Sequence, residues 1–359
     1  MDYTGRAEGV RKALAEQEAD ALLVTDLTNV RYLTGFDGTN GQVLVTSEDV
    51  VFFSDPRYAA RAADLVTDAE VVIYPARLTE ELQPRLVAGG IERLGLEGGT
   101  VTLAQRDELA KRLGEVELVA TKEIVERLRR AKAPEEVDLV RRAVAAGDAA
   151  FGWILERLAP GRRESDVALE LEMHIRAMGV EGISSPPIVG SGPLSAHIHH
   201  TPGGRVLTSG DFVLLDFGAR VGGYCSDLTR TVVLGAASDE QREQYATVLA
   251  AYSAGVAAVR TGVGGREADA AARAVVDAAG HGELFAHGIG HGVGLDIHEA
   301  PRLAKTSEDS LVTGDVVTVE PGIYLNGAGG VRIEDCVLVG EKRGEVLGRA
   351  PKDELIEIA

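Results

Sequence analysis

The region after residue 133 contains the same arrangement of helices twice, and this repeat constrains the fold more than any other feature of the chain. The first copy is a helix predicted over 134–158, a Pro-Gly break and a second helix over 163–179. The second copy is a helix over 238–260, a Thr-Gly break and a helix over 266–280. Both second helices begin with Arg-Glu-x-Asp and close on glycine, which is common at helix ends. Two structurally related halves are therefore expected.

An apolar strand that carries an acid near its end also occurs in both halves. The stretch GDFVLLDFG (210–218) is echoed 104 residues later by GDVVTVEPG (314–322), and a further apolar segment in each half brings a second acid. The four acids are Asp216, Asp227, Glu320 and Glu334. An ionised carboxylate among buried strands is costly unless it is paired with a cation. These acids therefore need positive charge close by.

Two sources of positive charge are available to the acids. Each acid could pair with a local arginine, such as Arg230 or Arg332, or could cap a turn, as an isolated acid at a strand end usually does. Four acids in duplicated positions with only two nearby arginines favour metal ions instead. Carboxylate oxygens select hard or borderline divalent cations such as Mn²⁺, Co²⁺ or Zn²⁺, and two ions fit this number of acids better than one.

The histidines gather in the same part of the chain. All eight lie between residues 174 and 298, and six lie in the clusters AHIHH (196–200) and HGIGHGVGLDIH (287–298). The alternating glycines of the second cluster predict a loop or extended ribbon, so its histidines are not a helical zinc pair of the HExxH type. His174 and His281 lie in or beside predicted helices, and a structural role is expected for both.

The N-terminal part of the chain has a different organisation. Apolar runs alternate with helical stretches over the first 120 or so residues, which is typical of an α/β domain. A chain of 359 residues is also longer than one core usually supports. We therefore predict an N-terminal domain over 1–130 and a C-terminal domain over 131–359.

Charge and composition exclude several classes of partner. The formal net charge of −19 would repel nucleic acid and anionic lipid surfaces, so neither partner is expected. No segment has the apolar length of a membrane-spanning helix or of a signal peptide, which predicts a cytoplasmic protein. The two cysteines, Cys225 and Cys336, are too few for a disulfide framework and are interpreted as small buried residues.

Several motifs of this sequence are similar to those of a known family. They are LDFGARVGGYCSDLTRTV (215–232), HGIGHGVGLDIHE (287–299), TVEPGIY (318–324) and VRIED (331–335). Together they resemble the pita-bread metallopeptidases, and the whole chain resembles their proline-specific branch, aminopeptidase P and prolidase. NVRYLTGFDGTNG (29–41) and SDPRYAARA (54–62) resemble the creatinase-type N-terminal domain. The resemblance implies that this α/β domain precedes a duplicated catalytic domain with a curved, mostly antiparallel sheet and flanking helices.

The same resemblance implies a role for each ligand position. Asp216 would chelate one metal ion, Asp227 and Glu334 would each bridge two ions, and His291 and Glu320 would complete the second site. Two divalent ions per chain are expected, with manganese favoured and cobalt or zinc as alternatives. A water molecule between two such cations becomes a nucleophile near neutral pH, which suits amide hydrolysis.

Further roles are also implied only by the resemblance. Glu320 would act as general base and then acid, and His287 and His298 would position the substrate and polarise its carbonyl group. His199 would line the pocket for proline. The arginine and the tyrosine expected to orient the ligand carboxylates are Arg332 and Tyr324.

The predicted function is the hydrolysis of the bond between an N-terminal residue and proline. An Xaa-Pro aminopeptidase is the first hypothesis, and an Xaa-Pro dipeptidase restricted to dipeptides is the alternative. A non-catalytic binding protein and a metal-independent relative of creatine amidinohydrolase are more distant hypotheses. Leu194 and Ile198 replace the asparagine and proline usual in the family, which changes the expected shape of the proline pocket. The resemblance also implies proline-containing peptides as partners and a homodimer or higher homo-oligomer.

Overall fold

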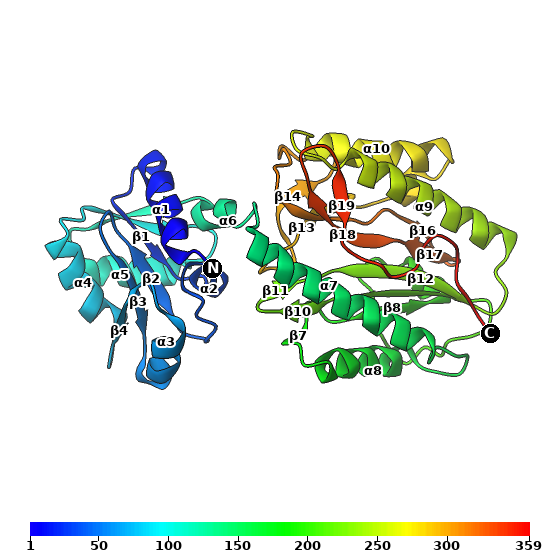
Figure 1. Ribbon diagram of the computed structural model, residues 1–359, viewed down its shortest axis with the longest axis horizontal. Helices are drawn as coiled ribbons and strands as arrows, with labels where there is room; N and C mark the ends of the chain where they lie inside the picture. The colour runs from blue at the N-terminus through cyan, green and yellow to red at the C-terminus, as the bar shows by residue number, and fades with distance from the viewer. The chain divides into compact units, whose positions relative to one another are not determined.

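The computed structural model describes residues 1–359, which divide into two compact units, Met1–Arg129 and Arg130–Ala359 (Figure 1). None of the helices is both long and apolar enough to cross a membrane. Each unit has its own sheet and its own hydrophobic core.

The N-terminal unit is built on a six-stranded mixed sheet with the strand order β4-β3-β2-β1-β5-β6. Its strands are β1 (Ala21–Val24), β2 (Gln42–Val45), β3 (Val50–Ser54), β4 (Glu70–Ile73), β5 (Arg93–Glu97) and β6 (Glu117–Thr121). Its helices are α1 (Tyr3–Leu14), α2 (Leu27–Thr34), α3 (Ala59–Leu65), α4 (Leu78–Ala88), α5 (Leu103–Leu113) and α6 (Ile124–Leu128). The parallel pairs β1–β5, β5–β6 and β3–β4 confirm the α/β class predicted for this part of the chain.

Local capping explains where helices of this unit begin. The Asp26 carboxylate accepts hydrogen bonds from the backbone N–H groups of Thr28 and Asn29 at the start of α2. Thr102 and Gln105 form a reciprocal capping box at the start of α5. Both arrangements satisfy backbone donors that have no partner within the first helical turn.

The second unit contains a nine-stranded sheet that shows the duplication directly. Its central path is β14-β13-β15-β18-β12-β9-β8, with β19 paired to β18 and β20 paired to β12. The strands of this sheet are β8 (Ile188–Ser191), β9 (Phe212–Phe217), β12 (Leu228–Leu234), β13 (Gly290–Gly292), β14 (Glu299–Leu303), β15 (Val316–Val319), β18 (Glu334–Val339), β19 (Gly344–Val346) and β20 (Glu357–Ile358). The first half supplies β8, β9 and β12, and the second half supplies the corresponding strands β13, β15 and β18. The two halves join at the centre of the sheet, where β12 pairs with β18.

Shorter strands and four long helices complete this unit. The small sheets consist of β7 (Gly182–Ile183), β10 (Ala219–Val221) and β11 (Tyr224–Cys225), and of β16 (Gly322–Leu325) and β17 (Gly329–Arg332). The helices are α7 (Pro134–Leu155), α8 (Glu164–Ala177), α9 (Asp239–Ala258) and α10 (Gly265–Ala278). Figure 1 shows both helix pairs flanking the strands of the unit.

Each helix pair packs on its own half of the sheet. Residues of α7 and α8 share a core with β9 and β12, whereas residues of α9 and α10 share a core with β15 and β18. Gly161 and Gly262 have φ angles of 93° and 86° at the breaks between the paired helices, a conformation that favours glycine. The predicted fold class, an α/β N-terminal domain and a duplicated, mostly antiparallel catalytic domain, is confirmed.

Candidate metal centre

The structure gathers the five predicted metal ligands at the centre of the nine-stranded sheet. Asp216 lies in β9, and Glu320 directly follows β15. Asp227 directly precedes β12, and Glu334 is the first residue of β18. His291 lies in β13, next to β15. Because β12 and β18 pair with each other, the acids from the two halves of the chain meet across the central strand pair.

The distances between ligand atoms are those of a metal-binding group. Asp227, His291 and Glu334 each offer one ligand atom, and these three atoms lie within 4.8 Å of one another. The His291 Nε2 atom is 3.4 Å from Glu320 Oε1 and 3.8 Å from Asp227 Oδ2. The donor set of carboxylate oxygens and one imidazole suits borderline divalent cations.

The electrostatics of the cluster indicate that positive charge belongs there. Asp227 Oδ1 and Glu334 Oε1 are buried and have no hydrogen-bond partner. Burial raises the pKa of Asp227 and of Glu334 well above the usual values, and repulsion among the neighbouring carboxylates raises both further. Burial also raises the pKa of Glu320 to about 8. Carboxylates that repel one another in a buried site, with oxygen atoms left unpaired, fit a bound divalent cation.

His291 is oriented as a metal ligand would be. Its Nδ1 atom lies 3.0 Å from the Gly292 carbonyl oxygen, to which the Nδ1–H group donates. The lone pair of Nε2 is therefore directed toward the carboxylates. Burial lowers the pKa of His291 to about 4, so the neutral imidazole that metal binding requires is the form present at neutral pH.

A hydrogen-bonded chain connects Asp216 to His287. Arg332 forms an ion pair with the Asp216 carboxylate and donates from Nη1 to the Tyr324 hydroxyl over 2.9 Å. Because that hydroxyl accepts from arginine, its own proton is directed to His287 Nε2, 2.8 Å away. His287 Nδ1–H then donates to the Gly288 carbonyl oxygen over 2.7 Å. Both nitrogens of His287 are thus engaged, and burial lowers its pKa to about 4.

His298 and His199 lie at the exposed side of the cluster. The His298 ring lies edge-on to His291, with 4.4 Å between the ring centroids. Partial burial lowers the pKa of His298, while the Asp216 carboxylate acts in the opposite direction. The structure therefore places both histidines near the predicted ligands, while their roles toward a substrate stay predictions.

The loop that departs from the family pattern lies beside this chain of hydrogen bonds. Arg332 Nη1 is 3.5 Å from the Ile198 carbonyl oxygen. The Ile198 side chain packs against a small apolar cluster that includes Ala196, Leu214 and Tyr324. This cluster gives the proposed metal centre an apolar neighbour.

Two further histidines and the two cysteines were predicted to have structural roles. His174 stacks on Trp153 with a centroid distance of 4.1 Å, and His281 follows the end of α10. Cys225 and Cys336 are free and buried, as predicted. The thiol of Cys336 lies 3.4 Å from the backbone nitrogen of Asp227.

Two threonines that the sequence analysis did not single out contact the ligand carboxylates. The Thr318 hydroxyl lies 3.2 Å from Glu320 Oε1 and accepts a hydrogen bond from the His291 backbone N–H group. The Thr229 hydroxyl lies 2.6 Å from Glu334 Oε2. For Thr318 a signal was available in the sequence, because Thr318 is two residues from Glu320 and side chains at that spacing in a strand share a face. The contact of Thr229 with Glu334 depends instead on the pairing of β12 with β18.

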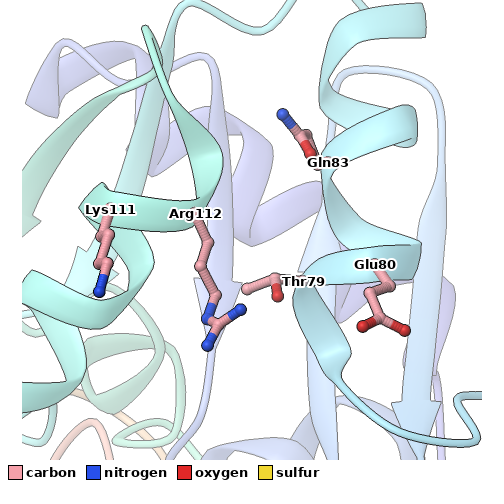
Figure 2. A pocket seen from close by; sticks show the side chains of 5 residues that line it. All are labelled: Thr79, Glu80, Gln83, Lys111 and Arg112. Carbon is pink, nitrogen blue, oxygen red and sulfur yellow. The ribbon is translucent and has the colours of Figure 1, made fainter.

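A hollow in the N-terminal unit offers no comparable chemistry. Figure 2 shows the side chains that line it, which come from α4 and α5. They are Thr79, Glu80, Gln83, Lys111 and Arg112. With one acid, no histidine and no cysteine, this lining lacks the ligands of a metal centre, and Arg112 is already paired with Glu108.

Two family models match the chain. Residues 138–341 match metallopeptidase family M24, and residues 6–131 match the creatinase/prolidase N-terminal domain. The chain belongs to metallopeptidase family M24. The family and the enzyme class predicted from the sequence are thereby confirmed.

Three proteins of known name match nearly the whole chain. The Xaa-Pro dipeptidase of Pyrococcus furiosus is 32% identical over 348 residues, which cover 97% of this chain and 99% of the relative. The structure of an Xaa-Pro dipeptidase from Bacillus anthracis has 40% identity and a TM-score of 0.96, and the match covers 99% of each chain. That of an X-Pro aminopeptidase from Thermotoga maritima has 30% identity and a TM-score of 0.91, covering 97% of this chain and 100% of that one.

Removing metal should make the stability of this M24 chain fall as pH rises above neutrality. The raised pKa of Glu320, about 8, means that the folded metal-free chain holds a proton that the unfolded chain has released. Its contribution to the free energy of unfolding therefore decreases with rising pH, by up to about 1.4 kcal/mol per pH unit. His287 and His291 act in the opposite direction, but only below their unfolded pKa of about 6.5.

The window from pH 7 to pH 8 isolates the effect of the carboxylates. We expect the melting temperature of chelator-treated protein to be lower at pH 8 than at pH 7, measured by circular dichroism. Addition of Mn²⁺ should raise the melting temperature more at pH 8 than at pH 7, because a cation replaces the proton. A metal-free melting temperature that rises over this window would contradict the expectation.

Proposed function

We propose that this M24 metallopeptidase is a dimetal exopeptidase that cleaves the peptide bond between an N-terminal residue and proline. The observation that carries the proposal is the group formed by Asp227, His291 and Glu334, with unpaired buried oxygen atoms on both acids. Glu320 lies 3.4 Å from His291, and Asp216 lies on the strand next to Asp227. The relatives from Pyrococcus furiosus, Bacillus anthracis and Thermotoga maritima, all named for Xaa-Pro or X-Pro cleavage, support the substrate class.

The five ligands divide between two cations in this proposal. Asp227 and Glu334 lie between the two halves of the sheet and would bridge both ions. Asp216 would hold one ion, and His291 with Glu320 would hold the other. Manganese is the expected metal, with cobalt and zinc as alternatives. When bound, the pair of ions would supply Lewis acidity to the scissile carbonyl group and to the attacking water.

The residues around the metals would move protons and orient the substrate. Glu320 would take the proton of the attacking water at a carboxylate oxygen and deliver it to the proline nitrogen that leaves. His287, His298 and His199 would position the peptide, and Arg332 with Tyr324 would keep Asp216 and His287 in place.

The preference for peptide length has two candidates. An aminopeptidase that accepts longer peptides is the first, and the aminopeptidase from Thermotoga maritima supports it. A dipeptidase is the second, and it is favoured by the higher identity of the Bacillus anthracis structure, 40% against 30%. The homo-oligomeric state and the cytoplasmic location stay predictions from the sequence.

A peptide-length comparison tests the proposal. Metal-free protein would be loaded with Mn²⁺, and hydrolysis of Ala-Pro, Ala-Pro-Ala and Ala-Ala-Ala would be followed by release of free alanine. We expect cleavage of at least one proline peptide and none of Ala-Ala-Ala, with activity lost on chelation. Cleavage of Ala-Pro alone would identify the dipeptidase, and cleavage of Ala-Pro-Ala the aminopeptidase. Equal cleavage of Ala-Ala-Ala would contradict proline specificity.

A further inference from the structure

We propose that Thr229 is a positioning residue for the metal centre, which turns Glu334 toward the metals and at the same time holds Arg332 against Asp216. This inference rests on the proposed function, because it assigns Thr229 a role in building the dimetal site. Thr229 would touch neither metal nor substrate.

The position of Thr229 in the sheet places it next to both Asp216 and Glu334. In the strand register Thr229 is opposite Asp216 of β9 on one side and opposite Glu334 of β18 on the other. The three residues therefore form one row across three adjacent strands. Side chains in one row of a sheet project from the same face. Thr229 thus stands between a predicted ligand of one half and a predicted ligand of the other.

The direction of the hydrogen bonds is determined by the donors available. Arg332 Nε–H can only donate, and it donates to Thr229 Oγ1 over 3.1 Å. The single proton of the Thr229 hydroxyl is then free for Glu334 Oε2, 2.6 Å away. Thr229 is fully buried, so no water competes for these bonds. The hydroxyl is an acceptor for the guanidinium and a donor for the carboxylate.

The consequence for Glu334 concerns its two oxygen atoms. With Oε2 bound to Thr229, the carboxylate cannot rotate freely, and Oε1 is left buried without a partner. Glu334 contributes one carboxylate oxygen to the group of ligand atoms shared with Asp227 and His291, and Oε1 is the oxygen that the bond to Thr229 leaves available. A carboxylate held by an outer hydrogen bond presents its remaining lone pairs to the metal with less loss of rotational freedom.

The consequence for Arg332 concerns its orientation. The guanidinium donates from Nη2 to Asp216, from Nη1 to Tyr324 and from Nε to Thr229. Of these three partners, Thr229 lies on β12, the strand between Asp216 of β9 and Glu334 of β18. Without it, Arg332 could turn toward Glu334 and compete with a cation for the carboxylate charge. Thr229 therefore keeps the arginine charge on Asp216.

Thr231 provides a matched control on the same strand. It is buried to a similar degree, but its hydroxyl pairs only with the backbone carbonyl and N–H groups of Arg332. Replacing Thr231 with valine removes as many hydrogen bonds as the same change at Thr229, without touching a ligand carboxylate. A purely structural role of buried threonine hydroxyl groups would affect both variants alike.

The experiment measures Mn²⁺ affinity of the metal-free full chain by titration calorimetry, together with the melting temperature with and without Mn²⁺. Thr229→Val should weaken binding by about 10- to 100-fold, the usual effect of removing a partner of a metal ligand. Thr229→Ser, which keeps the hydroxyl, should restore near wild-type affinity. Thr231→Val should lower the melting temperature of the metal-free chain and leave the affinity unchanged. If Thr229→Val does not fold, Thr229→Cys replaces it, since a thiol is a weaker donor and should give reduced affinity.

The outcomes distinguish a failure of the proposed dimetal function from a failure of the role proposed for Thr229. Wild-type protein that binds fewer than two Mn²⁺ ions per chain would overturn the dimetal function, and this inference with it. Wild-type protein that binds two ions, with Thr229→Val or Thr229→Cys of equal affinity, would overturn only the role of Thr229. Equal losses in Thr229→Val and Thr231→Val would do the same.

Discussion

Replacing Glu334 with glutamine should abolish hydrolysis of an Xaa-Pro peptide while the fold stays intact. The change removes one negative charge from the centre of the cluster and turns the carboxylate proposed to bridge the two ions into a neutral amide. Loss of metal stabilisation of the transition state is worth several kcal/mol, so we expect kcat to fall at least about 10³-fold. The measurement is the rate of Ala-Pro or Ala-Pro-Ala cleavage with saturating Mn²⁺. Asp227→Asn should behave in the same way, because Asp227 would bridge the same ions.

The stability of the metal-free Glu334→Gln variant distinguishes a lost ligand from a damaged fold. Burial and the neighbouring carboxylates raise the pKa of Glu334, so its ionised form is unfavourable when no cation is bound. A neutral glutamine relieves that repulsion and can keep a hydrogen bond with Thr229. We therefore expect a melting temperature, without metal, at least equal to that of the wild type. Full activity of either variant in added Mn²⁺ would show that the bridging assignment is wrong.

The duplication explains how much of this site the sequence could predict. The echo of GDFVLLDFG in GDVVTVEPG placed Asp216 and Glu320 on comparable strands of two halves. Burial of apolar strands then made each acid costly, which indicated a cation. The strand order that joins the halves at β12 and β18 is a tertiary property, because it depends on long-range pairing such as Thr229 with Glu334. Spacing along the chain could not show that pairing.

The hydrogen-bond partners of the histidines were less predictable than the ligands. The glycines around His287 and His291 predicted a loop or ribbon, and His291 lies in the short strand β13 between bends. The proton on His287, however, depends on the hydroxyl of Tyr324, which is 37 residues away in sequence. No local pattern encodes which ring nitrogen meets that hydroxyl. The same limit applies to Thr229, whose importance depends on two neighbouring strands.

The partners of the two arginines could not be predicted from their proximity to the acids in the sequence. Arg230 and Arg332 were both counted as local partners for the acids. Arg332 does pair with Asp216, but Arg230 pairs with Asp335 instead. Side chains alternate between the two faces of a strand, so Arg230 and its neighbour Thr229 point to opposite faces of the sheet. Thr229 and Glu334 therefore contact each other on the face of the proposed metal centre, whereas Arg230 and Asp335 form an ion pair on the other face.

Asp335→Asn should therefore destabilise the fold without removing the metal centre, which is the opposite of the result at Glu334. The Asp335 carboxylate is buried and contacts Arg230 at 2.8 Å, the Tyr252 hydroxyl at 2.7 Å and Lys352 at 3.1 Å. Removing one partner of a buried ion pair leaves the other charge uncompensated and costs about 3 to 5 kcal/mol. Asparagine keeps one acceptor oxygen, so we expect the lower end of that range.

The loss should appear as a fall in melting temperature of about 6 to 12 °C for a unit of this size. Activity per folded molecule and Mn²⁺ affinity at 25 °C should stay close to wild type, because the Asp335 side chain lies on the face of β18 away from the ligands. Arg230 also donates to the Glu334 and Ala350 carbonyl oxygens, so it anchors the C-terminal segment to the central strands. If the melting temperature of Asp335→Asn equals that of the wild type, Lys352 and these carbonyl groups are sufficient to hold the C-terminal segment. If Asp335→Asn loses Mn²⁺ binding, the two faces of the strand are coupled.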